Sequence, residues 1–178
     1  KTLNGKGTMV IEPDDTKLHQ LALNSGYVEK ALRYLHALQL MVLIIRPAAL
    51  AAAARFTREE LDELTDRFTS PGSVYLADIQ EAVLKHTTLE PLYVILSETN
   101  HLLEWGHHFA YYPSKRHTLS HLNKKAITAL RQLYEGNASS FADGMADCYR
   151  YILICMKKNM VEKYKFHNVA NIRVPEKY

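Results

Sequence analysis

The stretch that decides the fold is residues 27–45, which read YVEKALRYLHALQLMVLII. Its apolar positions recur every three or four residues, and they are Val28, Ala31, Leu35, Leu38, Val42 and Ile45. This spacing places all of them on one face of an α-helix. Further leucine, methionine and isoleucine side chains widen the stripe until the second half of the segment is apolar all round. Such a helix is either central in a fold or buried against a partner.

The segment that follows, residues 46–54, reads RPAALAAAA. Proline lacks a backbone N–H, and its ring clashes with the carbonyl one turn earlier, so Pro47 predicts the end of the first helix. The alanines then predict a short second helix that packs closely against its neighbours. A membrane span needs about 20 mostly apolar residues, and Arg46 beside Pro47 interrupts the run. We therefore expect a buried core hairpin and no membrane span.

The rest of the chain predicts further helices joined by short connections. Thr57 and Glu60 match a capping box, Pro91 suits the first turn of a helix, and Gly136 suits a helix end. Ser139 or Ser140 is expected to cap the last helix. The expected spans are residues 16–25, 57–68, 73–86, 91–112, 119–135 and about 140–165. The predicted fold class is all-α, a single-domain bundle of about seven or eight helices.

The chain divides into a helical body and two ends. Residues 1–13 hold two glycines and little helical pattern, so they predict an extended lead-in. Residues 14–167 form the predicted bundle domain, and residues 168–178 form a C-terminal tail without helical spacing. The first residue is Lys1 rather than methionine, from which we expect a fragment of a larger protein.

The composition is that of a globular protein, with 47% hydrophobic and 23% charged residues. Cys148 and Cys155 are seven residues apart on the last expected helix, about 10 Å along its axis, which is too far for a disulfide. Both are expected on the buried face of that helix. Free thiols suit a reducing compartment, so we expect an intracellular protein, cytoplasmic or nuclear.

The most unusual segment is residues 98–121, which hold the only tryptophan and five of the nine histidines. Trp105, Phe109 and Tyr112 follow one another at helical spacing and form an aromatic stripe. A stripe of this kind belongs either to the core or to a docking surface. We predict a non-enzymatic protein–protein interaction domain of a scaffold, adaptor or oligomer, which binds another protein or a second copy of itself. The predicted contact residues are Trp105, Phe109, Tyr111, Tyr112, Lys115 and Arg116.

A first alternative is a helical domain that binds RNA or DNA through its second half. The net charge is −1 over residues 1–89 and +4 over residues 90–178. Lysine and arginine neutralise phosphates, and nearby tyrosines offer rings on which bases stack. The cations assigned to this interface are Lys115, Arg116, Lys124, Lys125, Arg131, Lys157, Lys158 and Lys163.

A second alternative is a metal-dependent helical enzyme. His101, Glu104 and His108 lie three and four residues apart, so they share one helix face. Di-metal helix bundles use Glu-x-x-His pairs, but they need matching ligands on other helices, and the remaining histidines provide none. No serine elbow and no phosphate-binding glycine loop is present in the sequence. We therefore predict no catalytic residue, no metal and no cofactor.

Overall fold

The computed structural model describes residues 25–67, 75–107 and 115–176. These residues form six α-helices and one short 3₁₀-helix, and they contain no strand. The elements are α2 (Ser25–Ala53), α3 (Arg58–Arg67), α4 (Tyr75–His86), α5 (Glu90–His107), α6 (Lys115–Tyr134), α7 (Ala138–Glu162) and η1 (His167–Asn171). The all-α class is confirmed. The predicted number of seven or eight helices is too high for this part of the chain, and the helix predicted over residues 16–25 falls almost entirely outside it.

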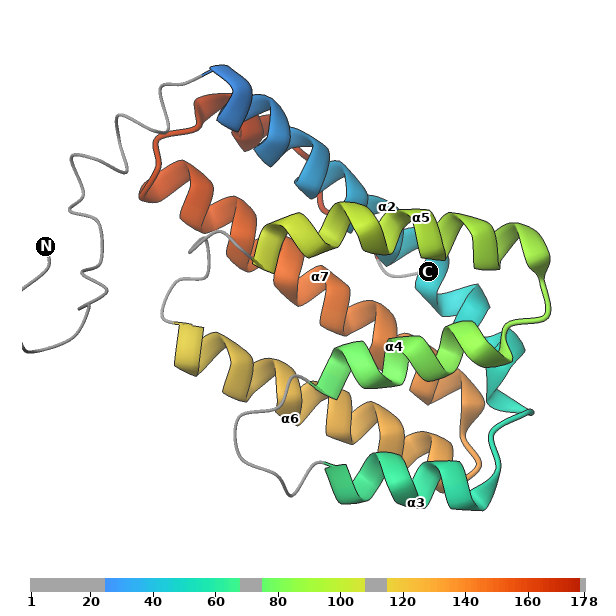
Figure 1. Ribbon diagram of the computed structural model, residues 1–178. Helices are drawn as coiled ribbons and strands as arrows, with labels where there is room; N and C mark the ends of the chain where they lie inside the picture. Colours follow the sequence, from blue (N-terminus) through green and yellow to red (C-terminus); the bar gives the residue numbers. More distant parts are fainter. Residues whose placement is uncertain (1–24, 68–74, 108–114, 177–178) are drawn as a thin grey trace, which may run out of the picture.

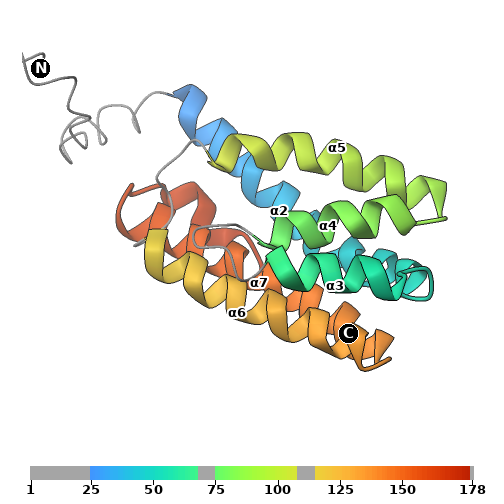
Figure 2. The same cartoon turned by 60° about the horizontal axis from the view of Figure 1, so that its bottom comes forward.

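Two long helices, α2 and α7, form the centre of the bundle. They run in opposite directions and pack against each other (Figure 1). Helix α6 packs on α7, α4 and α5 pack on α2, and α3 lies against α6 (Figure 2). Leu35, Met41 and Ile45 of α2 and Met145 and Leu153 of α7 are all fully buried. The apolar stripe predicted on residues 27–45 is therefore the core face of the central helix.

Pro47 does not end the central helix, because α2 continues through it to Ala53. The predicted break, the short separate helix and the core hairpin were wrong. The carbonyl that loses its donor belongs to Leu43, whose side chain is 40% exposed, and Pro47 is exposed too. Water can therefore solvate that carbonyl. On the opposite side Ala48, Ala49 and Ala52 are fully buried. Packing of this continuous face outweighs the local cost of the proline.

Helix α2 is also long and apolar enough to cross a membrane, as judged by length and composition alone. The segment Val28–Ala53 has a window with a mean hydropathy of 1.7, and half of that window is buried in the bundle. The central helix of a bundle meets the same criterion, because it too is apolar on most of its surface. The absence of a membrane span stays a prediction from Arg46 and Pro47.

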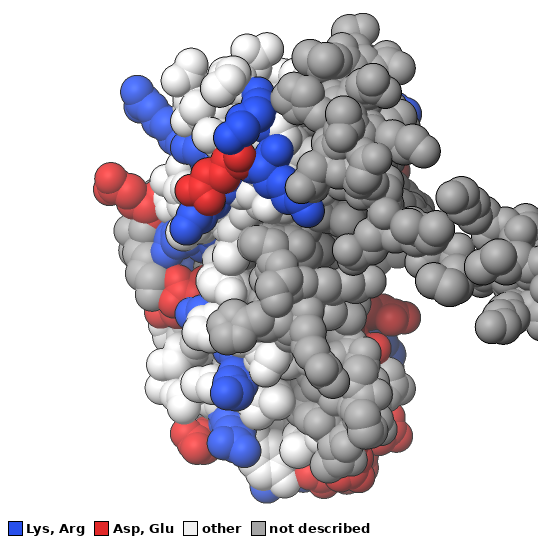
Figure 3. All heavy atoms as spheres, turned by 90° about the vertical axis from the view of Figure 1, so that its left-hand side faces the viewer, with Lys and Arg blue, Asp and Glu red and all other residues white. Residues whose placement is uncertain are grey.

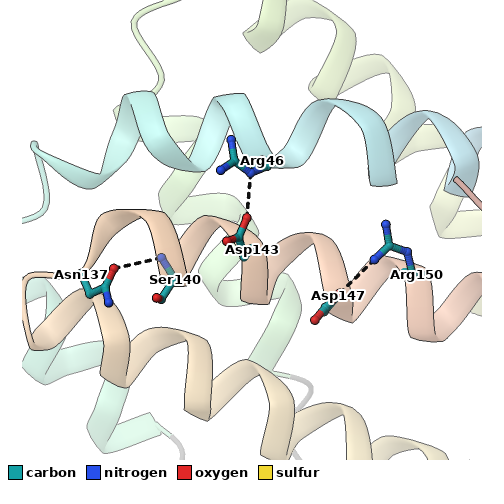
Figure 4. Close-up of polar contacts among 6 residues, drawn as sticks. All are labelled: Arg46, Asn137, Ser140, Asp143, Asp147 and Arg150. Carbon is teal, nitrogen blue, oxygen red and sulfur yellow. Dashed lines mark hydrogen bonds and ion pairs between the residues drawn. The ribbon is translucent and has the colours of Figure 1, made fainter. Parts of the chain in front are cut away.

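A polar contact joins α2 to α7 beside the proline. Arg46 Nε donates to Asp143 Oδ1 at 2.7 Å (Figure 4). The two side chains are 33% and 49% exposed, so this ion pair contributes at most about 1 kcal/mol. Arg46, which interrupts the apolar run in the sequence, therefore lies at the edge of the α2–α7 contact and is paired there.

The predicted capping box at the start of α3 is confirmed. The N–H of Glu60 donates to Thr57 Oγ1, and the N–H of Thr57 donates to Glu60 Oε2, each at 3.2 Å. The Glu60 carboxylate also contacts α4, through Lys85 Nζ at 2.7 Å and His86 Nε2 at 2.8 Å. The hydrogen bonds from Lys85 and from the Thr57 backbone lower the pKa of Glu60 from 4.5 to about 2. One carboxylate thus caps α3 and holds the end of α4.

We expect Glu60→Gln to lower the free energy of unfolding by about 1 kcal/mol at neutral pH. The folded pKa of Glu60 lies below its ordinary value, so the ionised carboxylate stabilises the fold above pH 4.5. This contribution is lost as the pH falls through about 2. The difference in the free energy of unfolding between wild type and Glu60→Gln, measured by urea unfolding, should therefore shrink as the pH falls from 4.5 to about 2.

Glu59→Gln is the matched control, because Glu59 is exposed and lies in the same first turn of α3. It removes the same charge without touching the contacts to α4. A Glu60→Gln effect that stays constant from pH 7 down to about pH 2, or that Glu59→Gln reproduces, would contradict this account.

Helix α7 begins one turn after the end of α6. Gly136 has a φ of +83°, a value that glycine adopts readily, and it lets the chain turn between the two helices. The cap is Asn137, whose side chain accepts a hydrogen bond from the N–H of Ser140 at 3.1 Å (Figure 4). The prediction of Ser139 or Ser140 as the cap was therefore wrong. The glycine and the asparagine together set where α7 starts.

The end of the chain is folded onto the bundle. Phe166, Val169 and Ile172 are buried, and η1 occupies His167–Asn171. A 3₁₀-helix has three residues per turn, which is the spacing of these three side chains. The prediction that residues 168–178 form a tail without helical pattern was therefore wrong for residues 168–171, whose spacing is that of a 3₁₀-helix and not of an α-helix. Lys157 Nζ donates to the carbonyl of Ile172 at 2.6 Å, and Gln39 Nε2 donates to that of Arg173 at 2.6 Å.

Candidate interaction surface

Helix α5 carries a group of large apolar side chains that point to solvent. Tyr93, Val94 and Ile95 are 48%, 52% and 39% exposed, and Leu89, just before the helix, is 49% exposed. On the other side of the helix Leu96 is fully buried. Helices at a protein surface ordinarily turn charged and polar residues outward, but α5 is apolar on both sides here. We call Leu89, Tyr93, Val94 and Ile95 the α5 face.

Other exposed apolar side chains are few in the described part of the chain. Leu40 and Leu43 are 37% and 40% exposed on α2, the helix on which α5 packs. The remaining large exposed apolar side chain among the described residues is Ile154, which belongs to α7 and is 46% exposed. Exposed apolar groups thus gather on α5 and its neighbour. Such a patch, when it is contiguous, marks binding sites for other molecules.

The start of α5 follows the prediction made from Pro91. The proline lies in the first turn, where its missing N–H has no helical partner to lose. The N–H groups of Leu92 and Tyr93 donate to the carbonyl of Leu89 at 2.9 and 3.0 Å. This hydrogen bonding fixes the beginning of the helix and places Tyr93, Val94 and Ile95 within its first two turns.

The charges of α5 are all of one sign. The helix contains Glu90, Glu98 and Glu104 and has no lysine or arginine. Glu90 and Glu98 are exposed, and they lie before and after Tyr93, Val94 and Ile95 along the helix. The charges that α5 itself contributes beside the exposed apolar side chains are therefore negative.

The structure places only part of the predicted partner surface. Trp105 lies in α5, and Lys115 and Arg116 begin α6, but the described side chains do not include these three. Phe109, Tyr111 and Tyr112 lie outside the described residues, so the predicted surface stays a prediction. Position 105 is eleven residues beyond position 94, or about three helical turns, which puts both backbone positions on the same side of α5.

The predicted nucleic-acid residues are gathered only in part. Lys124 and Lys125 lie together on α6 beside α7, whereas Lys157 reaches the tail carbonyl described above. Lys163 lies just past α7, with its Nζ 5.8 Å from the ring centre of Tyr164. Two more of the predicted cations, Arg131 of α6 and Lys158 of α7, are exposed, and Lys158 Nζ is 4.0 Å from Glu162.

The weak metal alternative is not placed by the structure. The side chains of His101 and Glu104 and the whole of His108 lie outside the described residues. Among the described residues no three His, Cys, Asp or Glu side chains are grouped so that they could hold a metal ion. The expectation that the protein binds no metal stays a prediction.

The two cysteines differ in their surroundings. Cys148 is fully buried, and burial raises the pKa of its thiol to about 12, which keeps it protonated and unreactive. Cys155 is only half-buried, so the prediction of a buried position was wrong for this residue. Burial and a hydrogen bond with Cys155 raise the pKa of Tyr151 to about 12.

No known protein family, curated protein or solved structure matches the chain. We therefore infer the function from the chemistry of the surface and of the helices that carry it.

Proposed function

We propose that this domain is a non-catalytic protein-interaction module that docks an amphipathic helix of another protein on the α5 face. The observation that carries the proposal is the exposure of Tyr93, Val94 and Ile95 on a helix whose opposite side is packed in the bundle. Docking an apolar helix face into such a surface is a common mode of recognition, in which residues at spacings of three and four act as anchors. Trp105, on the same side of the helix backbone, extends the proposed contact.

The negative charges of α5 indicate which charges the partner helix carries beside its apolar stripe. A helix that docks beside Glu90 and Glu98 gains from lysine or arginine on either side of its apolar stripe. A second copy docking α5 on α5 is less favourable. In an antiparallel pair centred on Val94, Glu90 of one copy faces Glu98 of the other, and these like charges repel. We therefore infer a partner of different sequence with basic flanks.

The setting of the proposed module is intracellular, as part of a larger scaffold or adaptor. Its support is the pair of free cysteines, Cys148 and Cys155, since thiols persist in a reducing compartment. The mainly apolar contact resembles those in which a few buried aromatic or aliphatic anchors provide most of the binding energy.

The proposal is tested with two synthetic peptides that share one helical stripe of leucine and isoleucine. One peptide carries lysines beside the stripe and the other carries glutamates. In a calorimetric titration at about 50 mM salt we expect the lysine peptide to bind at least about tenfold more tightly than the glutamate peptide. The reason is that Glu90 and Glu98 attract the lysines of the first peptide and repel the glutamates of the second. The difference should shrink as salt rises.

Light scattering on the free protein and on each mixture gives the mass of the species. We expect a one-to-one complex with the lysine peptide. No binding of either peptide, or tighter binding of the glutamate peptide, would overturn the assigned partner chemistry.

A further inference from the structure

A second surface, distinct from α5, is the groove between α6 and α7. The two helices approach closely where Gly144 meets Ala129, and the groove beside this contact has a volume of about 280 Å³. Its lining comes from both helices and includes His121, Lys124, Lys125, Thr128, Gln132 and Asp147. These six side chains are polar, but Ala129 and Gly144 also line the groove, and most of its exposed lining surface is apolar.

The groove has a positive lining. Helix α6 contains five lysines and arginines and no acidic residue. On the face shown in Figure 3, several Lys and Arg side chains lie among Asp and Glu on the described part of the surface. The acidic group of the groove, Asp147, is paired with Arg150 Nη1 at 3.1 Å (Figure 4). Lys124 is exposed and Lys125 is half-buried, and both line the groove.

The cations are spread along the helix. Lys124 and Arg131 are seven residues apart, so they lie on one side of α6, about 10 Å apart along its axis at 1.5 Å per residue. A single phosphate occupies a small part of this length. A stacked single strand, with about 3.4 Å between neighbouring phosphates, places several phosphates along this length of the helix.

An aromatic ring lies beside the lysines. Tyr151 of α7 is 4.8 Å from the ring of His121, measured between ring centres, and Lys125 Nζ is 5.9 Å from the centre of the Tyr151 ring. Tyr151 is half-buried. Aromatic rings next to a basic track are the surfaces on which unpaired bases stack.

We propose that the α6–α7 groove binds the backbone of a single-stranded nucleic acid, with Lys124 and Lys125 on phosphates and a base stacked beside Tyr151 and His121. The inference does not depend on the α5 face, because it concerns other helices and the opposite charge. Among polyanions, a single strand is favoured over an acidic peptide because it provides both repeated phosphates and flat rings.

Fluorescence anisotropy with a labelled oligothymidylate of about twelve nucleotides tests the inference. We expect binding at about 50 mM salt that weakens by about tenfold at about 200 mM, as about three phosphate contacts predict. The double variant Lys124→Glu, Lys125→Glu should lose at least about tenfold in affinity. Lys124→Glu alone, at an exposed position, should lose several-fold and leaves the half-buried Lys125 in place.

The matched control is Lys165→Glu, Arg173→Glu, which makes the same change in net charge at exposed positions past the end of α7. Its affinity should stay within about twofold of wild type. Absence of binding at about 50 mM salt, an equal loss in both double variants, or equally tight binding of polyglutamate would each overturn the inference. Circular dichroism of every variant establishes that the helices are intact.

Discussion

Replacing Pro47 by alanine is expected to raise the free energy of unfolding by about 2 kcal/mol. The proline lies inside α2, where it removes one hydrogen bond to the carbonyl of Leu43 and crowds that carbonyl, at a cost of about 3 kcal/mol. Alanine restores the N–H and relieves the contact. Alanine also raises the conformational entropy of the unfolded chain, which reduces this gain in the free energy of unfolding by up to about 1 kcal/mol.

Pro91→Ala is the control for this effect. Pro91 lies in the first turn of α5, where an N–H has no helical acceptor, so alanine gains nothing there. Urea unfolding should show a rise for Pro47→Ala and no rise for Pro91→Ala. A loss of stability in Pro47→Ala would contradict the continuous helix, because it would place Pro47 at the favourable first turn of a separate helix.

Replacing Gly144 by alanine is expected to lower the free energy of unfolding by about 1–3 kcal/mol. In an unconstrained helix the same change stabilises by about 1 kcal/mol, so the sign is diagnostic. A Cβ at Gly144 comes within 2.6 Å of Ala129 Cβ and 3.2 Å of Ala129 Cα. Neither atom can move away without moving the backbone of α6, so the two helices must separate.

A second substitution separates this contact from a general effect. Ala129→Gly removes the methyl group that the new Cβ meets, while it costs about 1 kcal/mol of helix propensity. We expect the double variant Gly144→Ala, Ala129→Gly to be more stable than the sum of the single effects predicts. Additive effects in thermal or urea unfolding would mean that α6 and α7 do not meet at these two residues.

Much of the fold was predictable because its causes are local. The stripe from Ala31 to Ile45, the capping box at Thr57 and Glu60, and the turn at Gly136 all depend on neighbours in the sequence, and the structure confirms them. The path through Pro47 was not predictable in this way. It depends on burial of Ala48, Ala49 and Ala52, a tertiary contribution that exceeds a local cost.

The surfaces were less predictable than the helices. The run from Leu92 to Leu96 is apolar all round, and this signal indicates a helix with two apolar faces, but it does not tell which face the bundle covers. That choice depends on how α5 packs on α2. The meeting of Lys125 with Tyr151 likewise needs the alignment of α6 against α7, since the two residues are far apart in the sequence.

The measurement that tests the proposed function most directly compares two variants in the titration with the lysine peptide. Val94→Asn changes the centre of the α5 face, and Ile154→Asn changes an apolar residue of similar exposure on α7, 46% against 52%. We predict that Val94→Asn weakens binding at least about tenfold, or about 1.4 kcal/mol, while Ile154→Asn leaves it unchanged. Equal affinities of the two variants, with both folded, would show that the partner does not dock on α5.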